Sequence, residues 1–208
     1  MAALLFDLDG VLVDSLQAYR EAWTTWAEAY HITREEFPTE IHGLRPKDVI
    51  MRLRPDEARA VEDFDTLFDG PAANDVRAMP GAVDLTSALE GRPWAIVSSS
   101  QRRHVEAALR GAGIGLPPVL ICGDDIEVGK PDPSCFLLAA ERLGVPAGDC
   151  VVVEDAPSGL TAARAAGMES VAVATTHEPD SLTSAGRVYP TLAEATPYLL
   201  ERSAGEHR

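Results

Sequence analysis

Lysine is scarce in this sequence of 208 residues. Of the 18 basic residues only Lys47 and Lys130 are lysines, and all the others are arginines. The chain therefore uses arginine wherever a solvated cation is sufficient. A lysine in such a background is a candidate for a role that an ammonium group fills better than a guanidinium group.

Cysteine is also rare, and its pattern favours neither a disulfide framework nor a zinc site. Cys122, Cys135 and Cys150 are odd in number, show no CxxC spacing and have no histidines at metal-ligand intervals. We therefore expect the three cysteines to be small buried hydrophobic residues.

Long apolar runs are missing as well. None approaches the roughly 20 residues that a membrane-spanning helix needs. The N-terminus has no basic region and no cleavage-site pattern, so the sequence predicts no secretory signal. We expect a cytoplasmic protein with no membrane partner, present as a monomer or weak dimer.

Negative charge exceeds positive charge, and the formal net charge is −15. Nucleic-acid binding depends on neutralisation of phosphates by lysine and arginine, so this charge argues against a nucleic-acid partner. The same charge repels an anionic substrate unless the site carries local positive charge. The length and the apolar content of 46% suffice for one domain, or for one domain with a small insertion.

Short apolar runs rich in Val, Ile and Leu predict buried strands, and most are separated by helix-length segments. This alternation is typical of parallel strands joined by right-handed crossovers, and it predicts an α/β fold with a doubly wound, Rossmann-like parallel sheet. Residues from about Ser203 onward are expected to form a frayed tail. The predicted strands cover residues 2–6, 94–97, 119–122, 151–153, 171–174 and, more weakly, 187–189, and the predicted helices cover residues 102–110, 133–143 and 158–166.

Residues 15–78 interrupt this alternation and predict a small all-helical cap domain inserted after the first strand. The predicted core domain then consists of residues 1–14 and 79–208. Pro46 and Pro55 stand where two helices of the cap would begin. Aromatic and apolar residues at spacings of 3, 4, 3 and 4 form the stripe of an amphipathic helix: Leu16, Tyr19, Trp23, Trp26 and Tyr30.

Acidic pairs follow two of the predicted strands. Asp7 and Asp9 come after the first strand, and Glu154 and Asp155 come after the strand at 151–153. Either pair alone also fits a simple Asp-Gly turn or a helix cap. In a doubly wound sheet, however, ligands bind outside the carboxyl ends of the strands, so the two pairs would face each other and raise each other's pKa. A divalent cation relieves this repulsion, and oxygen ligands without histidine or thiolate favour Mg²⁺.

Polar residues follow two further strands. Ser98 and Ser99 precede a predicted helix, whose N-terminus favours an anion, although a serine there also fits capping. Lys130 follows the strand at 119–122 and is held between a glycine and a proline. Its plain alternative is a solvated turn lysine. Of these residues, Ser98 could offer its hydroxyl to a phosphate oxygen beside the N-terminus of the helix.

In order and spacing, these four strand ends resemble the motifs of the haloacid dehalogenase superfamily. The segment Asp7-Leu8-Asp9-Gly10 is similar to its first motif, Ser98 to the second, Lys130 to the third and Glu154-Asp155 to the fourth. The resemblance covers essentially the whole chain, including the predicted cap. Segments 5–15, 41–43, 79–82, 93–97 and 151–159 look like the bacterial hexose- and polyol-phosphate phosphatases of this superfamily.

The resemblance implies a Mg²⁺-dependent phosphatase that hydrolyses a small sugar or polyol phosphate through a covalent intermediate. Asp7 would be the nucleophile, and Asp9 would be the general acid and then the general base. Asp7, the backbone carbonyl of Asp9 and Asp155 would hold the metal, with Glu154 as a further ligand. Three side chains would bind the phosphoryl group: Ser98, Ser99 and Lys130.

The cap segment His42-Gly43 resembles the cap loop that faces the site in these phosphatases, and Arg45 beside it would also bind substrate. The main alternative is a β-phosphoglucomutase-like mutase, a group that carries a histidine where this sequence has Tyr19. Dehalogenases lack an acid at the position of Asp9. A binding module that has kept only the fold would lack one of the two aspartates of the first motif, and both are present.

Overall fold

A parallel sheet of six strands forms the centre of the molecule, as the sequence predicts. The computed structural model describes residues 1–39, 41–68 and 76–205. The strands follow the order β5-β4-β1-β6-β7-β8, and every neighbouring pair is parallel. Their bounds are β1 Ala3–Phe6, β4 Trp94–Val97, β5 Val119–Ile121, β6 Cys150–Glu154, β7 Glu169–Val173 and β8 Arg187–Tyr189.

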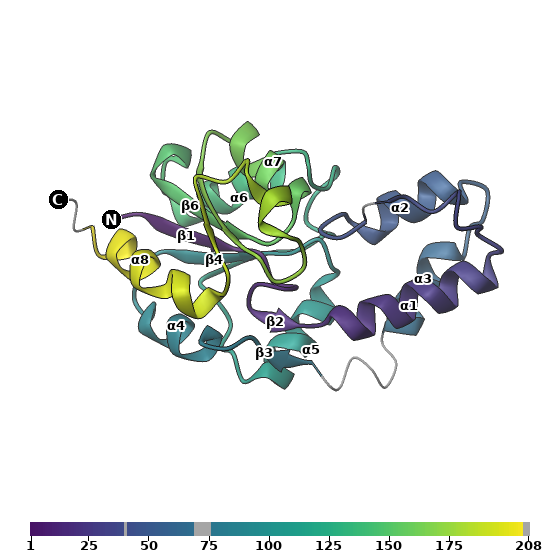
Figure 1. Cartoon of the computed structure of the whole chain (residues 1–208), viewed down its shortest axis with the longest axis horizontal. Helices are drawn as coiled ribbons and strands as arrows, with labels where there is room; N and C mark the ends of the chain where they lie inside the picture. Colours follow the sequence, from purple (N-terminus) through teal and green to yellow (C-terminus); the bar gives the residue numbers. More distant parts are fainter. Residues whose placement is uncertain (40, 69–75, 206–208) are drawn as a thin grey trace.

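Helices cover both faces of the sheet (Figure 1), which confirms the doubly wound class. Alternate residues of each strand point to opposite faces. Leu4 and Phe6 of β1 pack in one apolar cluster with α4 (Ala82–Ala88), α5 (Arg102–Ala112) and α8 (Leu192–Ala204). Leu5 packs in a second cluster with α6 (Ser134–Leu143) and α7 (Pro157–Ala165). Short 3₁₀ turns occupy Ala147–Asp149 and Pro179–Leu182.

The strand order reverses between β1 and β6, which lie side by side at the centre of the sheet. The chain runs from β1 outward to β4 and β5, and then returns to β6 and runs outward to β7 and β8 on the other side. Phe6 is paired with Val153, so the residues that follow these two strands emerge next to each other. A crevice at such a reversal is the usual ligand site of an open α/β sheet.

Three helices project from this sheet on the right of Figure 1: α1 (Leu16–Ala29), α2 (Pro46–Leu53) and α3 (Ala60–Phe68). They pack around an apolar cluster of their own, in which Trp23, Trp26 and Phe64 are buried. The indole Nε1 of Trp26 donates to the carbonyl of Ala60 at 2.8 Å. The predicted amphipathic stripe therefore faces the interior of the cap. The predicted limits of the cap domain remain a prediction, and residues 40 and 69–75 within them lie outside the described residues.

Several details differ from the sequence-based expectations. Pro46 begins α2 as predicted, whereas Pro55 lies in a turn and α3 begins only at Ala60. Two short strands, β2 (Val13–Asp14) and β3 (Arg77–Ala78), pair antiparallel where the chain leaves the sheet and returns to it. Strands of two residues are too short to produce a periodic signal.

The predicted frayed tail from Ser203 is also wrong at its start. Ser203 belongs to α8 and is fully buried, and its Oγ accepts a hydrogen bond from Arg92 at 2.7 Å. The backbone N–H of Ala2 donates to the carbonyl of Arg202, so the end of α8 is fastened to the first strand. Neither α8 nor α4 was predicted, and Pro197 interrupts the helical pattern of α8. Residues 206–208 lie outside the described residues.

Among the described residues, no helix is both long and apolar enough to cross a membrane.

We expect the cap to unfold separately when its own cluster is damaged. Phe64→Ala removes a side chain that is buried between α1 and α3, at a cost of about 3–5 kcal/mol. Native-state hydrogen exchange should then show loss of protection in α1–α3, with the sheet still protected. The matched change Leu199→Ala, in the apolar cluster that α4, α5 and α8 form with the sheet, should lower protection of the sheet instead. Equal losses in both regions after Phe64→Ala would contradict a separately packed cap.

Candidate active site

The ammonium group of Lys130 is buried at the reversal point and joins three strand ends. Its Nζ donates to Oδ1 of Asp7 at 2.5 Å, to Oε1 of Glu154 at 2.7 Å and to the carbonyl of Val97 at 3.1 Å. Asp7 follows β1, Glu154 ends β6 and Val97 ends β4. The three N–H groups of the lysine are thus all used, each on a different strand. An arginine fork would not fit this compact arrangement of acceptors.

The charges in this cluster shift the pKa values of Lys130 and Asp7. Burial by itself lowers the pKa of Lys130, but the charges of Asp7 and Glu154 outweigh burial and raise it, so the ammonium stays charged. Burial raises the pKa of Asp7, and Lys130 opposes this effect, but Glu154, Asp155 and Asp9 raise the pKa further. One lysine therefore does not balance the four carboxylates.

Asp155 has the properties of a ligand for a cation. Its Oδ2 accepts hydrogen bonds from Nε2 of His42 at 3.0 Å and from Oγ1 of Thr176 at 2.6 Å. Its Oδ1 is buried and has no hydrogen-bond partner among the described residues. Carboxylate oxygens of Asp7, Glu154 and Asp155 lie within 4.8 Å of one another. An unsatisfied buried oxygen beside other carboxylates fits a hard cation such as Mg²⁺.

Both oxygens of Glu154 already have partners. Oε1 accepts from Lys130, and Oε2 accepts from the backbone N–H groups of Asp155 at 3.0 Å and Ala156 at 3.1 Å. The geometry therefore favours Glu154 as the residue that orients Lys130. Sequence reasoning assigned no role to Gly159, where a Cβ would lie 1.7 Å from Oε1 of Glu154. A glycine in the first turn of a predicted helix was the available signal.

Hydroxyl groups orient the carboxylate of Asp9. Ser15 donates to its Oδ1 at 2.5 Å, and Ser100 donates to its Oδ2 at 3.4 Å. Gly10 has φ of +82°, and a Cβ there would lie 2.1 Å from Oδ2 of Asp155. Only glycine therefore allows the chain to turn directly after Asp9 this close to Asp155. Neither Ser15 nor Ser100 was predicted as a site residue.

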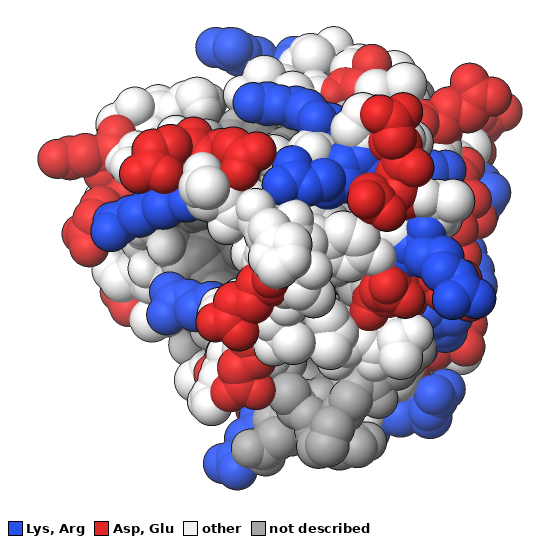
Figure 2. Space-filling model, turned by 90° about the vertical axis from the view of Figure 1, so that its right-hand side faces the viewer, with Lys and Arg blue, Asp and Glu red and all other residues white. Residues whose placement is uncertain are grey.

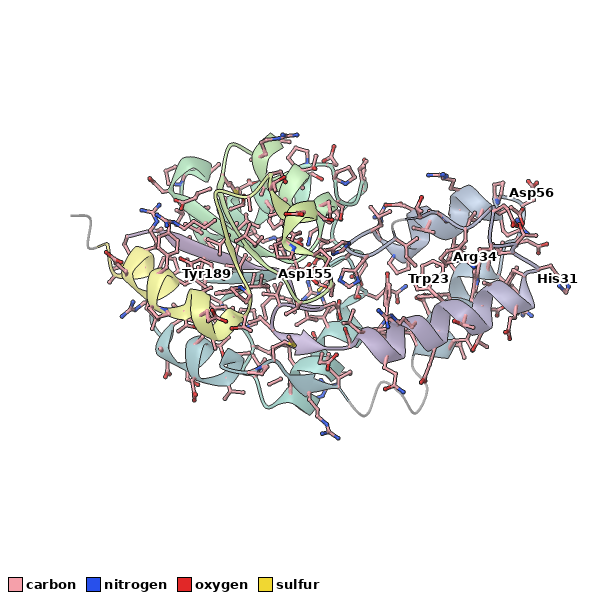
Figure 3. All side chains as sticks on the ribbon, viewed as in Figure 1. Trp23, His31, Arg34, Asp56, Asp155 and Tyr189 are labelled. Atoms are coloured by element: carbon pink, nitrogen blue, oxygen red, sulfur yellow. The ribbon has the colours of Figure 1, made fainter. Side chains whose placement is uncertain are left out.

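A small cavity of about 20 Å³ lies between the sheet and the cap, and Figure 3 shows Asp155 at this junction. Besides Asp7, the cavity is lined by four residues that the sequence analysis assigned to the site: Asp9, His42, Gly43 and Ser99. The structure therefore brings the two aspartates together with the cap loop. Ser98 is buried and is not among the lining residues, and its Oγ accepts from the N–H of Ser100 at 3.1 Å. The lining consists of Asp7, Asp9, Tyr19, His42, Gly43, Leu44, Ser99 and Ser100.

The cap loop is held against the strand ends by hydrogen bonds to its backbone. Ser99 donates to the carbonyl of Gly43 at 2.7 Å, and Ser158 donates to the carbonyl of His42 at 3.3 Å. Gly43 has φ of +77°, and a Cβ there would lie 2.5 Å from Oγ of Ser158. A larger residue would prevent this close approach, so the glycine sets the distance between loop and sheet.

Arg45 fastens the cap to the segment that leads to Lys130. Its Nε and one terminal nitrogen bind the Asp48 carboxylate at 2.9 and 2.6 Å. Its remaining N–H groups bind the carbonyls of Gly123 at 3.0 Å, Ile126 at 2.6 Å and Glu127 at 2.5 Å. All five donors of the guanidinium are thus used. The predicted substrate contact of Arg45 finds no support in this geometry, because no donor remains for a substrate.

The fold and the site define a class of enzyme: an α/β protein whose carboxylates and lysine meet at the reversal point of a parallel sheet, under a helical cap. The family model described as haloacid dehalogenase-like hydrolase matches residues 1–167. The chain therefore belongs to the haloacid dehalogenase-like hydrolases, as the sequence motifs indicate.

Curated relatives of the chain include phosphatases. The hexitol phosphatase A of Escherichia coli K12 is 37% identical over 201 residues, which cover 92% of each chain. The validoxylamine A 7′-phosphate phosphatase of Streptomyces hygroscopicus subsp. limoneus is 33% identical over 91% of this chain and 93% of the relative. A hydrolase from Pseudomonas syringae has a similar crystal structure, with a TM-score of 0.85 and 26% identity over 97% of this chain and 99% of that one.

We expect Arg45→Ala to release the cap from the segment at 123–130. Removal of the guanidinium leaves three carbonyls and Asp48 without their donor, and we expect the free energy of unfolding to fall by about 3 kcal/mol. Hydrogen exchange of the amides at 123–130 should become faster. The matched change Arg52→Ala, at an exposed arginine in the last turn of α2, should leave that exchange as it was. Unchanged exchange in the Arg45 variant would contradict the link.

Proposed function

We propose that this chain is a Mg²⁺-dependent phosphatase that hydrolyses the phosphate monoester of a small sugar or polyol through an aspartyl-phosphate on Asp7. The observation that carries the proposal is the contact of Asp7 with Lys130 at the reversal point, beside a cavity that Asp9 also lines. A buried carboxylate next to a fixed positive charge has the position and charge environment of a nucleophile that attacks a phosphoryl group.

In the first step, a carboxylate oxygen of Asp7 attacks phosphorus, and the bond between phosphorus and the leaving oxygen breaks. Asp9 gives a proton to that oxygen, so the leaving group departs as a neutral alcohol. In the second step, Asp9 takes a proton from water, and the resulting hydroxide attacks phosphorus and frees Asp7. The hydrogen bonds from Ser15 and Ser100 support this role, because they fix the carboxylate beside the cavity.

Lys130 contributes the fixed positive charge beside the attacking oxygen of Asp7. Asp7, Asp155 and the backbone carbonyl of Asp9 would hold Mg²⁺, which would neutralise charge on the transferring phosphoryl group. The unsatisfied oxygen of Asp155 supports this ligand set. Glu154 would act by orienting Lys130. Local positive charge of this kind would offset the repulsion between an anionic substrate and a chain with a net charge of −15.

The names of the relatives support a sugar or polyol phosphate as the substrate, since these proteins include a hexitol phosphatase and a validoxylamine A 7′-phosphate phosphatase. On the cap side, His42 and Gly43 line the cavity and would contact the leaving group, and Ser99 lines it from the sheet side. Ser98, buried directly after β4, would donate its hydroxyl to a phosphoryl oxygen from the sheet side.

We expect the purified protein to release phosphate from hexose and polyol phosphates in the presence of Mg²⁺. Excess chelator should abolish the release, because the acidic cluster loses its counter-charge. Asp7→Asn should lower kcat by at least about 10³-fold, since the nucleophile is lost. The matched change Asp84→Asn, at an exposed acid in α4, should have no effect. The measurement is the rate at which each protein releases phosphate from a panel of phosphorylated sugars and polyols.

Two results would contradict the proposal. Full turnover by clean Asp7→Asn protein would remove Asp7 as the nucleophile. Isomerisation of glucose 1-phosphate to glucose 6-phosphate, dependent on a hexose bisphosphate and without net phosphate release, would establish the mutase alternative despite Tyr19.

A further inference from the structure

A fifth strand end adjoins the acidic cluster. The four sequence motifs follow β1, β4, β5 and β6, whereas the segment 175–177, with the sequence Thr-Thr-His, follows β7. We call this segment the β7 loop. The sequence analysis assigned no site residue to it, and it lies beyond residues 1–167, which the family model matches. Ala172 of β7 is paired with Glu154 of β6, so the β7 loop emerges beside Asp155.

The β7 loop contacts the residues that follow both acidic strands. Thr175 donates from its Oγ1 to the carbonyl of Gly10 at 2.5 Å, in the turn directly after Asp9. Thr176 donates from its Oγ1 to Oδ2 of Asp155 at 2.6 Å. The methyl group of Thr176 lies close to Gly10, because a Cβ on that glycine would lie 2.9 Å from Cγ2 of the threonine. Two neighbouring threonines therefore join the turn after β1 to the carboxylate after β6.

The contacts of Thr176 assign its single hydroxyl proton. Its Oγ1 lies 2.6 Å from Oδ2 of Asp155, 3.0 Å from the backbone carbonyl of Asp155 and 2.9 Å from Nδ1 of His177. An ionised carboxylate can only accept, it is the strongest acceptor of the three, and its contact is the shortest, so the hydroxyl donates to it. The carbonyl of Asp155 accepts from His177 at 2.9 Å when Nδ1 of that ring carries the proton. The β7 loop therefore binds Asp155 through both its side chain and its backbone.

These contacts determine which oxygen of Asp155 is left for a cation. Oδ2 accepts from Thr176 and from His42, whereas the buried Oδ1 has no hydrogen-bond partner among the described residues. A carboxylate is planar, so a donor that holds Oδ2 also sets the direction of Oδ1. His42 comes from the cap loop, and Thr176 follows a strand of the sheet that carries the acidic cluster. Thr176 is therefore the donor that the sheet itself provides.

We propose that Thr176 is a positioning residue of the metal site, whose hydrogen bond to Oδ2 of Asp155 presents Oδ1 to Mg²⁺. This inference rests on the metal site of the proposed function and adds a residue to it that acts through Asp155. Hydrogen-bond partners of metal ligands commonly contribute about 10- to 100-fold to metal affinity. The hydroxyl is neutral, so it orients the carboxylate without placing a second positive charge beside the cation, as a lysine or arginine would.

The test is a direct measurement of Mg²⁺ affinity by isothermal titration calorimetry, with no substrate present. Thr176→Val keeps the shape of the side chain and removes the hydroxyl, so the Kd for Mg²⁺ should rise by about 10- to 100-fold. Thr176→Ala also removes the hydroxyl and should show the same loss. Thr176→Ser retains the donor, so its Kd should stay close to that of the unchanged protein.

Two further variants serve as controls. Thr161→Val makes the same chemical change at a half-buried threonine whose Oγ1 donates to the carbonyl of Pro157 within α7, and it should leave the Kd unchanged. Asp155→Ala removes the proposed ligand and measures the background from other acids. The face of the molecule in Figure 2 carries several groups of exposed Asp and Glu side chains, which would bind Mg²⁺ weakly in every variant. The melting temperature without metal shows whether each variant is folded, and added Mg²⁺ should raise it less in Thr176→Val than in the unchanged protein.

Three results would count against the account, and they can be told apart. An unchanged Mg²⁺ affinity in folded Thr176→Val or Thr176→Ala protein would overturn the role of Thr176 and leave the rest of the proposed function standing. A loss in Thr176→Ser as large as in Thr176→Val would overturn it as well, because the affinity would then not follow the hydroxyl. Binding of Mg²⁺ by the unchanged protein that is no tighter than in Asp155→Ala would overturn the metal site of the proposed function itself.

Discussion

The buried contact of Lys130 with Asp7 and Glu154 is the interaction on which the rest of the site depends. A lysine without access to water keeps its charge only because two carboxylates surround it, and each carboxylate tolerates burial because the lysine is there. The three partners of the ammonium come from three different strands, so the sheet has to form before the cluster can. The cluster in turn fixes Oδ1 of Asp7, and Oδ1 of Asp155 beside it has no hydrogen-bond partner among the described residues.

The cap is joined to this cluster through the same strand ends. Arg45 holds the segment that leads to Lys130, Ser99 holds the cap loop, and His42 contacts Asp155. On the sheet side these contacts involve residues close in sequence to the proposed site: Glu127 in the segment before Lys130, Ser99 directly after Ser98, and Asp155 itself. Docking of the cap and assembly of the proposed site are therefore coupled, and such an arrangement would exclude bulk water from a bound substrate.

The sequence predicted the sheet correctly, because buried parallel strands are continuous apolar runs, and it placed the residues of the proposed site at strand ends, where the structure has them. It could not predict that the guanidinium of Arg45 donates to three carbonyls more than 70 residues away in the chain. Local sequence patterns carry no information about contacts between side chains and distant segments. The same limit hid Gly159, whose importance comes from the side chain of Glu154 rather than from a turn. Pro55 was misjudged because proline fits a turn as well as the start of a helix.

The most direct test of the account is to trap the covalent intermediate. Protein that is turning over a hexitol phosphate with Mg²⁺ would be quenched in acid within milliseconds and digested, and the peptide masses would be measured. The account predicts the mass of one added phosphoryl group on the peptide that contains Asp7, and no such addition in Asp7→Asn protein. A phosphoryl group on another residue, or steady turnover with no covalent adduct at all, would contradict it.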